Sequence, residues 1–200
     1  TSRAYHDLEV ERLWKRVWQF ACREEDIPEV GDHIRYDIAG MSFLIVRAEG
    51  GAIKAFPNAC LHRGRMLKEF DGRATELRCA FHGFAWELDG CFKDLPAQWD
   101  FPHIDQAEWN LPEVQVGTWG GFIFVNMDEK PSQTLEEAMG EQGRDLVGYP
   151  FASGQAVFEY EGTINCNWKS MIDSFCETYH VPVLHRHSVK DTLAGPDNPY

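Results

Sequence analysis

Two short motifs decide the fold of this chain: Cys60-Leu61-His62 and, after sixteen intervening residues, Cys79-Ala80-Phe81-His82. Each motif follows a run with the composition of a β-strand, so we expect two loops that meet at one end of a small sheet. Each loop supplies one thiolate and one imidazole. A structural zinc site usually pairs Cys with Cys and His with His at separations of about two to five residues. The mixed order instead suits a two-iron cluster, in which two thiolates hold one iron and two histidines hold the other.

The composition is that of a globular protein. Of the 200 residues, 44% are apolar and 13% are aromatic, which excludes disorder for the bulk of the chain. The net charge of −13 disfavours binding to nucleic acid or to an anionic membrane. The longest apolar runs have the length of strands and fall far short of the roughly 20 residues of a membrane-spanning helix. We therefore expect a cytoplasmic protein. The six cysteines are too few for a disulfide scaffold.

Secondary structure changes in character along the sequence. Apolar periodicity predicts a helix over 8–20 that is capped by Asp7. Helical composition returns at 134–139 and again from about 167 to 179, with an alternating strand between them at 155–162. The middle of the chain is divided by glycine-containing turns into short β-rich runs at 43–46, 53–56, 76–78, 84–88, 114–116 and 121–125. The sequence therefore predicts an α+β chain with a small antiparallel β domain in its middle.

A second group of metal-binding side chains lies about a hundred residues after the first. Asp173, Glu177 and His180 are spaced at i, i+4 and i+7, so an unbroken helix would place them on one face. Pro182 then breaks the helix, which would allow His185 to turn toward His180. Two histidines and one carboxylate are typical of non-haem Fe(II) oxygenases, although a His-x4-His pair alone is also common on protein surfaces.

The combination of these motifs resembles the catalytic α subunit of Rieske non-haem iron oxygenases, the ring-hydroxylating family. The resemblance implies that Cys60, His62, Cys79 and His82 bind a Rieske [2Fe–2S] cluster. Replacing two thiolates by neutral imidazoles raises the potential of such a cluster to roughly −150 to +300 mV, which suits a one-electron relay.

The resemblance also implies that His180 and His185 bind a mononuclear Fe(II). The third iron ligand of the family is an Asp or Glu much farther along than this sequence reaches. Asp191 and Asp197 lie too close to His185 to fit that pattern, and we interpret them as solvated loop acids. His187 forms a His-x-His pair with His185, but the spacing in the family favours His185.

Glu177 matches the carboxylate that, in this family, bridges a cluster histidine of one subunit and an iron-bound histidine of the next. Such a carboxylate would fix the tautomers of both imidazoles and shorten the path between the two metal sites. Many ring dioxygenases have Asp here, whereas some members, including quaternary-ammonium demethylases, have Glu. Asp173 either supports this site or faces a subunit interface.

The fold class implied by the resemblance is α+β. An antiparallel β Rieske domain is expected over 31–130, after an N-terminal helix over 1–30 that packs on the catalytic domain. Residues 131–200 would begin a truncated mononuclear-iron domain with a helix on an antiparallel sheet, of the helix-grip or START-like type.

The implied function is the terminal component of an oxygenase. It would use O2 and electrons from NAD(P)H, delivered by a separate reductase and in some systems a ferredoxin, to hydroxylate a small aromatic or other organic substrate. A homotrimer is implied, with or without a β subunit. Three alternatives stay open: monooxygenation or oxidative demethylation, for example of a quaternary amine; a Rieske protein that only transfers electrons; and a structural zinc protein.

Overall fold

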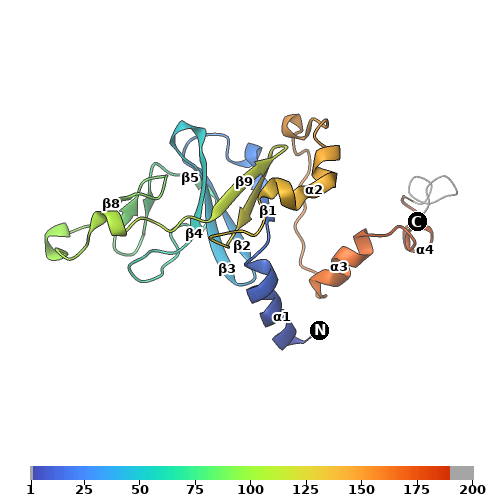
Figure 1. The fold of residues 1–200 in the computed structure, drawn as a ribbon, viewed down its shortest axis with the longest axis horizontal. Coiled ribbons are helices and arrows are strands. Elements are labelled where there is room, and N and C mark those ends of the chain that lie inside the picture. Colours follow the sequence, from blue (N-terminus) through green and yellow to red (C-terminus); the bar gives the residue numbers. More distant parts are fainter. Residues whose placement is uncertain (1, 190–200) are drawn as a thin grey trace. The chain divides into compact units, whose positions relative to one another are not determined.

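The structure is a computed structural model that describes residues 2–189, and its contacts divide the chain into two compact units. The first unit covers Ser2–Gln155 and the second begins at Ala156. The first unit contains nearly all of the regular structure (Figure 1). None of the helices within the described residues has the length and the apolar character needed to cross a lipid bilayer.

The strands of the first unit form three antiparallel sheets. The first has the order β1-β10-β9, with β1 at Gln19–Arg23, β10 at Phe122–Asn126 and β9 at Gln115–Trp119. The second has the order β4-β3-β2-β5, built from β4 (Ile53–Pro57), β3 (Met41–Arg47), β2 (Asp32–Ile38) and β5 (Gly72–Arg73). The third has the order β6-β7-β8, built from β6 (Leu77–Arg78), β7 (Ala85–Trp86) and β8 (Phe92–Asp94). The predicted α+β class is confirmed.

The position of β3 between two core clusters explains why its sequence is continuously apolar. Successive side chains of a strand point to opposite faces of the sheet. Leu44 and Val46 therefore enter one core cluster, whereas Ile45 enters another together with Ile123 and Val125. Because both faces of β3 are covered, the strand has no polar side and no alternation in its sequence.

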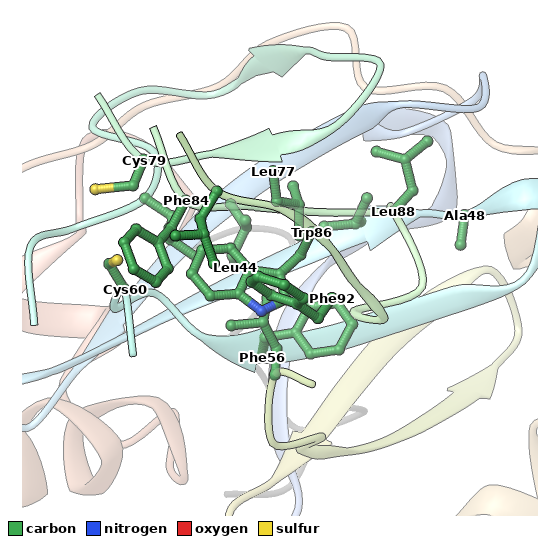
Figure 2. Packing of buried hydrophobic residues seen from close by; sticks show 14 residues of the cluster. Leu44, Ala48, Phe56, Cys60, Leu77, Cys79, Phe84, Trp86, Leu88 and Phe92 are labelled. Carbon is green, nitrogen blue, oxygen red and sulfur yellow. The ribbon is translucent and has the colours of Figure 1, made fainter. Parts of the chain in front are cut away.

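The larger core cluster lies under the two predicted ligand loops. It contains Phe56, Trp86 and Phe92 and also both cysteines of the motifs, Cys60 and Cys79. Figure 2 shows the two sulfur atoms at one edge of this cluster, beside the ring of Phe84. The candidate metal-binding thiols are thus part of the hydrophobic core.

The N-terminal prediction was partly wrong. The helix α1 covers Arg3–Glu9 and continues as a π-helical turn over Val10–Trp14, so it begins earlier and ends earlier than predicted. Asp7 lies within it and accepts a hydrogen bond from Arg3 Nε (3.0 Å) instead of capping it. The predicted end of the helix is the strand β1, in which Gln19 pairs with Val125. Pairing with β10 therefore overrides the helical periodicity of this segment.

The helix α2 (Leu135–Asp145) confirms the helical composition noted at 134–139 and extends it. Thr134 caps it, because its hydroxyl accepts a hydrogen bond from the backbone N–H of Glu137 (3.2 Å) and the Glu137 carboxylate accepts one from the backbone N–H of Thr134 (2.8 Å). This reciprocal capping box satisfies two backbone donors that would otherwise lack intrahelical partners. Short 3₁₀ turns occupy Glu24–Asp26, Glu49–Gly51, Gln98–Asp100, Gln106–Glu108 and Phe151–Ser153.

The described residues of the second unit form two short helices, α3 (Trp168–Phe175) and α4 (Val181–Leu184). The strand predicted at 155–162 does not form, and the described residues provide it with no hydrogen-bonding neighbour. The helix predicted to 179 ends at Phe175, so Glu177 and His180 lie in the turn after it. Pro182 stands in the first turn of α4, where its missing N–H costs nothing, and therefore helps to begin a helix.

Candidate metal centres

The first ligand loop is closed by two backbone hydrogen bonds. The N–H of Cys60 donates to the carbonyl of Arg65 (2.8 Å), and the N–H of Gly64 donates back to the carbonyl of Cys60 (2.8 Å). Gly64 has a φ of +71°, in the left-handed region that favours glycine. The loop is therefore a tight arc that holds His62 between its two ends.

The second ligand loop repeats this pattern. The N–H of Cys79 donates to the carbonyl of Phe84 (2.8 Å), the N–H of Gly83 donates to the carbonyl of Cys79 (3.0 Å), and Gly83 has a φ of +77°. A Cβ atom at Gly83 would lie 2.8 Å from Cγ of Pro96, so a side chain is excluded there by space as well as by φ. Both motifs thus form the same turn, although the histidine stands two residues after the cysteine in one and three residues after it in the other.

A buried asparagine that the sequence analysis missed supports the first loop. The Asn58 side chain accepts hydrogen bonds from the backbone N–H groups of Leu67 and Lys68 (both 3.0 Å) and donates to the carbonyl of Lys68 (2.8 Å) and to Ser42 Oγ (3.3 Å). Asn58 is 3% exposed, so each of these bonds satisfies a group that is shielded from water. The position of Asn58, two residues before Cys60, is the sequence feature that could have suggested this supporting role.

The four donor side chains meet as two like pairs. Cys60 and Cys79 are 4% and 2% exposed, and the Cys79 thiol lies close enough to Cys60 to add to the effect of burial in raising the pKa of Cys60. The rings of His62 and His82 have centroids 4.7 Å apart. This separation of sulfur from nitrogen fits a two-iron cluster, which binds thiolates at one iron and imidazoles at the other. A single tetrahedral zinc would need all four donors around one point.

The protonation states also fit a metal-binding role. Burial raises the pKa of the Cys60 thiol, so a bound metal would have to displace its proton. Desolvation lowers the pKa of His62, helped by the neighbouring His82, and this keeps the imidazole neutral and able to bind a metal. The Nδ1 atom of His62 is buried and has no hydrogen-bond partner within the described residues, so a coordination bond would satisfy it.

Aromatic rings cover the histidines. Phe84 stacks on His62 with centroids 4.7 Å apart and planes 20° apart, and Phe81 lies 3.8 Å from His82 between centroids. Phe84 is buried at 2% exposure, whereas Phe81 is 59% exposed. One histidine is thus packed against the core, and the other is covered by a ring that faces solvent.

The second predicted site lies in the turn after α3 and at the two ends of α4. The rings of His180 and His185 have centroids 5.3 Å apart, so the chain does bring them together. Their pairing follows from α4, which places the two histidines at its two ends. His187 instead accepts a hydrogen bond from Nε of Arg186 (2.9 Å).

Glu177 is bound to His180 twice. Its Oε1 accepts a hydrogen bond from Nδ1 of the ring (2.5 Å), and its Oε2 accepts one from the backbone N–H (3.2 Å). The ring hydrogen bond lowers the pKa of Glu177, which keeps the carboxylate charged and assigns the imidazole proton to Nδ1. Nε2 of His180 is then the atom with a free lone pair for a metal. The backbone bond also takes the N–H that a continuing helix would direct to the carbonyl of Cys176, so it holds the turn that follows α3.

No three His, Cys, Asp or Glu side chains among residues 2–189 gather closely enough to hold one ion, so the donors of both sites come as pairs. Asp173 lies in the last turn of α3. Asp191 and Asp197 lie outside the described residues. A groove of about 620 Å³ runs between β9 and α2 and is lined in part by Trp18, Trp119 and Met139; none of the predicted ligands lines it.

Comparison with protein families finds two matches in succession. Residues 17–107 match the Rieske [2Fe-2S] domain, and residues 133–200 match the catalytic domain of the ring hydroxylating alpha subunit. The first match contains all four residues of the two ligand loops, and the second contains Glu177, His180 and His185.

Individual relatives match nearly the whole chain. Choline monooxygenase of Beta vulgaris chloroplasts is 27% identical over 192 residues, which are 94% of this chain and 43% of that protein. The solved structure of naphthalene 1,2-dioxygenase from Rhodococcus sp. with bound indole is 31% identical, with a TM-score of 0.82 over 98% of this chain and 46% of that one. A quaternary ammonium Rieske monooxygenase in complex with L-carnitine shares the fold, with a TM-score of 0.87 at 23% identity over 93% of this chain and 53% of that one. The chain thus spans about half the length of the proteins it matches.

Proposed function

Because the chain belongs to the family of Rieske ring-hydroxylating oxygenase alpha subunits, we propose that the whole protein is the terminal component of a mono- or dioxygenase. The observation that carries this proposal is the presence, on one chain, of a paired-thiol and paired-imidazole site and of a separate histidine pair with a bound carboxylate. An electron carrier would need only the first site. A structural zinc protein would need neither the pairing of like donors nor the second site.

The proposed roles of the residues follow from their chemistry. Cys60 and Cys79 bind one iron of a Rieske cluster, and His62 and His82 bind the other. The cluster supplies single electrons, and a mononuclear Fe(II) supplies O2 activation. The burial of both thiols excludes water and competing ligands from the sulfur side.

At the second site, His180 and His185 are the proposed iron ligands. Glu177 holds the proton of His180 at Nδ1, which points Nε2 at the metal and raises the basicity of the ring. The Oε1 and Oε2 atoms retain lone pairs beyond the two bonds that they accept, so the carboxylate can also receive an N–H from a cluster histidine of a neighbouring subunit. This bridge requires a head-to-tail homotrimer, with or without a β subunit, and a reductase that delivers electrons from NAD(P)H with or without a ferredoxin. The proposed domain boundaries place the N-terminal helix at 1–30, the Rieske domain at 31–130 and the beginning of the catalytic domain at 131–200. The proposed location of the protein is the cytoplasm.

Two substrate classes are supported. The likeness to naphthalene 1,2-dioxygenase favours an aromatic substrate. The likeness to choline monooxygenase, together with Glu rather than Asp at position 177, favours a quaternary amine that is hydroxylated or demethylated.

Labelled O2 separates these possibilities. The whole protein is supplied with a reductase, NAD(P)H and either naphthalene or choline, and the products are analysed by mass spectrometry. Two labelled oxygens in a cis-diol indicate dioxygenation, whereas one labelled oxygen in a hydroxylated product, or release of a methyl group as formaldehyde, indicates monooxygenation. A cluster that is reduced and reoxidised without hydroxylating or demethylating any of a broad panel of aromatic and quaternary-amine substrates would contradict the oxygenase proposal and favour electron transfer.

A further inference from the structure

The second ligand loop has a support that differs in kind from that of the first. Arg78 immediately precedes Cys79, and its guanidinium reaches across the mouth of the loop to the carbonyl of Gly83 (Nη1 to O, 2.6 Å). Gly83 immediately follows His82. One side chain thus ties together the two ends of the segment that carries both candidate ligands of this loop.

The guanidinium is itself anchored from two sides. It forms a fork with Asp94 at the end of β8, with Nη1 to Oδ1 at 3.0 Å and Nη2 to Oδ2 at 3.3 Å. Its Nε donates to Oε1 of Glu76 at 2.5 Å, and Lys93 contacts the same carboxylate (3.2 Å). Two carboxylates therefore hold the planar group in one orientation, as a single point charge on a lysine could not.

Arg78 adds a side-chain bond to the two backbone hydrogen bonds that close this loop. Gly83 is in a left-handed conformation and has no side chain to pack, and Phe81 is largely exposed. The first loop is supported by the uncharged, buried amide of Asn58, which accepts hydrogen bonds from the backbone of Leu67 and Lys68. The hydrogen-bonding pattern of the two turns is the same, and both have a cation nearby: Arg63 acts electrostatically on His62 in the first turn, whereas Arg78 is hydrogen-bonded to the backbone of the second.

We infer that Arg78 is a positioning residue for the cluster: its fork to Asp94 and its bond to Gly83 hold Cys79 and His82 at the spacing that the cluster requires, and its charge favours the reduced cluster. This inference rests on the proposed cluster. Reduction adds one negative charge to the cluster, so a neighbouring cation stabilises the reduced state, and hydrogen bonding and net charge around a cluster set its potential. Arg78 acts through the loop, because its side-chain hydrogen bonds go to Glu76, Gly83 and Asp94.

The test uses the whole protein with its metals and compares the variants R78Q and R78K with wild type. R78Q is expected to lower the reduction potential of the cluster, to change the shape of its EPR signal, and to speed the loss of the cluster to a chelator several-fold. R78K retains the charge but not the fork, so it should restore most of the potential while leaving the EPR signal altered and the loss of the cluster fast.

The matched control is R73Q. Arg73, on β5, forms a comparable fork with Asp32 on β2 (2.6 and 3.2 Å). Both residues lie outside the ligand loops. R73Q should leave the potential, the EPR signal and the rate of cluster loss as in wild type. Equal values for R78Q and R73Q in all three measurements would overturn the inference.

A further variant guards against misfolding. D94N weakens the fork but leaves the bond between Arg78 and Gly83, so it should release the cluster faster than wild type and more slowly than R78Q. If R78Q does not fold, wild-type behaviour of D94N overturns the inference. The absence of a Rieske signal in the wild-type protein would contradict the proposed cluster instead, so the two failures are distinguishable.

Discussion

The two candidate metal centres differ in how the chain prepares them. At the first, the thiols of Cys60 and Cys79 are almost fully buried, and both loops are closed by backbone hydrogen bonds. At the second, the side chains of His180 and Glu177 are 29% and 42% exposed, and a single carboxylate orients the pair. A cluster that only passes electrons can be enclosed in a core, whereas an iron that binds O2 and substrate must keep open positions.

The comparison predicts that each site assembles independently of the other, and Glu177 is the proposed link between them. Their ligands lie in separate units of the chain, so each should lose its metal without the other. The following changes test this independence.

The largest effect is expected from Cys79→Ser, because a serine hydroxyl does not replace a thiolate at iron. About two irons per subunit and the visible absorption should be lost, while the mononuclear iron stays. Iron analysis and absorption spectra measure this. Cys91→Ser is the control, because that thiol is exposed and lies outside both loops. A coloured Cys79→Ser protein would show that this cysteine is not a ligand.

His180→Ala should remove about one iron per subunit and abolish oxygenation, while the EPR signal of the reduced cluster is unchanged. His187→Ala provides the control, because His187 bonds to Arg186 and not to the histidine pair. The reverse result, with iron lost only from His187→Ala, would show that His187 and not His180 binds the iron.

Glu177→Gln preserves the shape of the side chain but removes the charge that holds the His180 proton. Both sites should keep their iron, and the reoxidation of the reduced cluster by O2 and substrate should slow by about 10–100-fold. Rapid-mixing absorption measures that rate. Glu161→Gln, at an exposed carboxylate that precedes α3, is the control. An unchanged rate in Glu177→Gln would contradict the bridging role.

The smallest effect is expected from Thr134→Ala, which removes the cap of α2. The free energy of unfolding should fall by about 1 kcal/mol, as measured by denaturant titration. Iron content should not change at either site, since this residue belongs to neither. Loss of cluster in this variant would mean that metal retention follows overall stability and not the loops.

Sequence reasoning was strongest where the signal is local. Each ligand loop has both of its metal-binding side chains within a few residues of sequence. The strands β3 and β4 could be predicted from their apolar runs. The strands β6, β7 and β8 have only two or three residues, and β8 gave no periodic signal at all. The segment that becomes β1 has helical spacing, and only its pairing with β10, a hundred residues away, decides otherwise.

The supports of the site were harder to predict than the proposed ligands. Asn58 and Arg78 hold the loops through partners 9 to 16 residues away, among them Leu67 and Asp94. No spacing rule links such residues, because the fold alone brings them together. At the second site, the sequence suggested a continuous helix through Glu177, whereas α3 ends at Phe175 and the side chain of Glu177 bonds to the backbone N–H of His180 in the turn that follows.

The most direct test of the account is the metal content and EPR spectrum of the whole protein purified without oxygen. We predict about three irons per subunit, two in a cluster with a Rieske signal on reduction and one that is lost from His180→Ala. Colourless protein with zinc in place of iron would contradict the cluster. About two irons per subunit, unaffected by His180→Ala, would contradict the second site and leave an electron carrier.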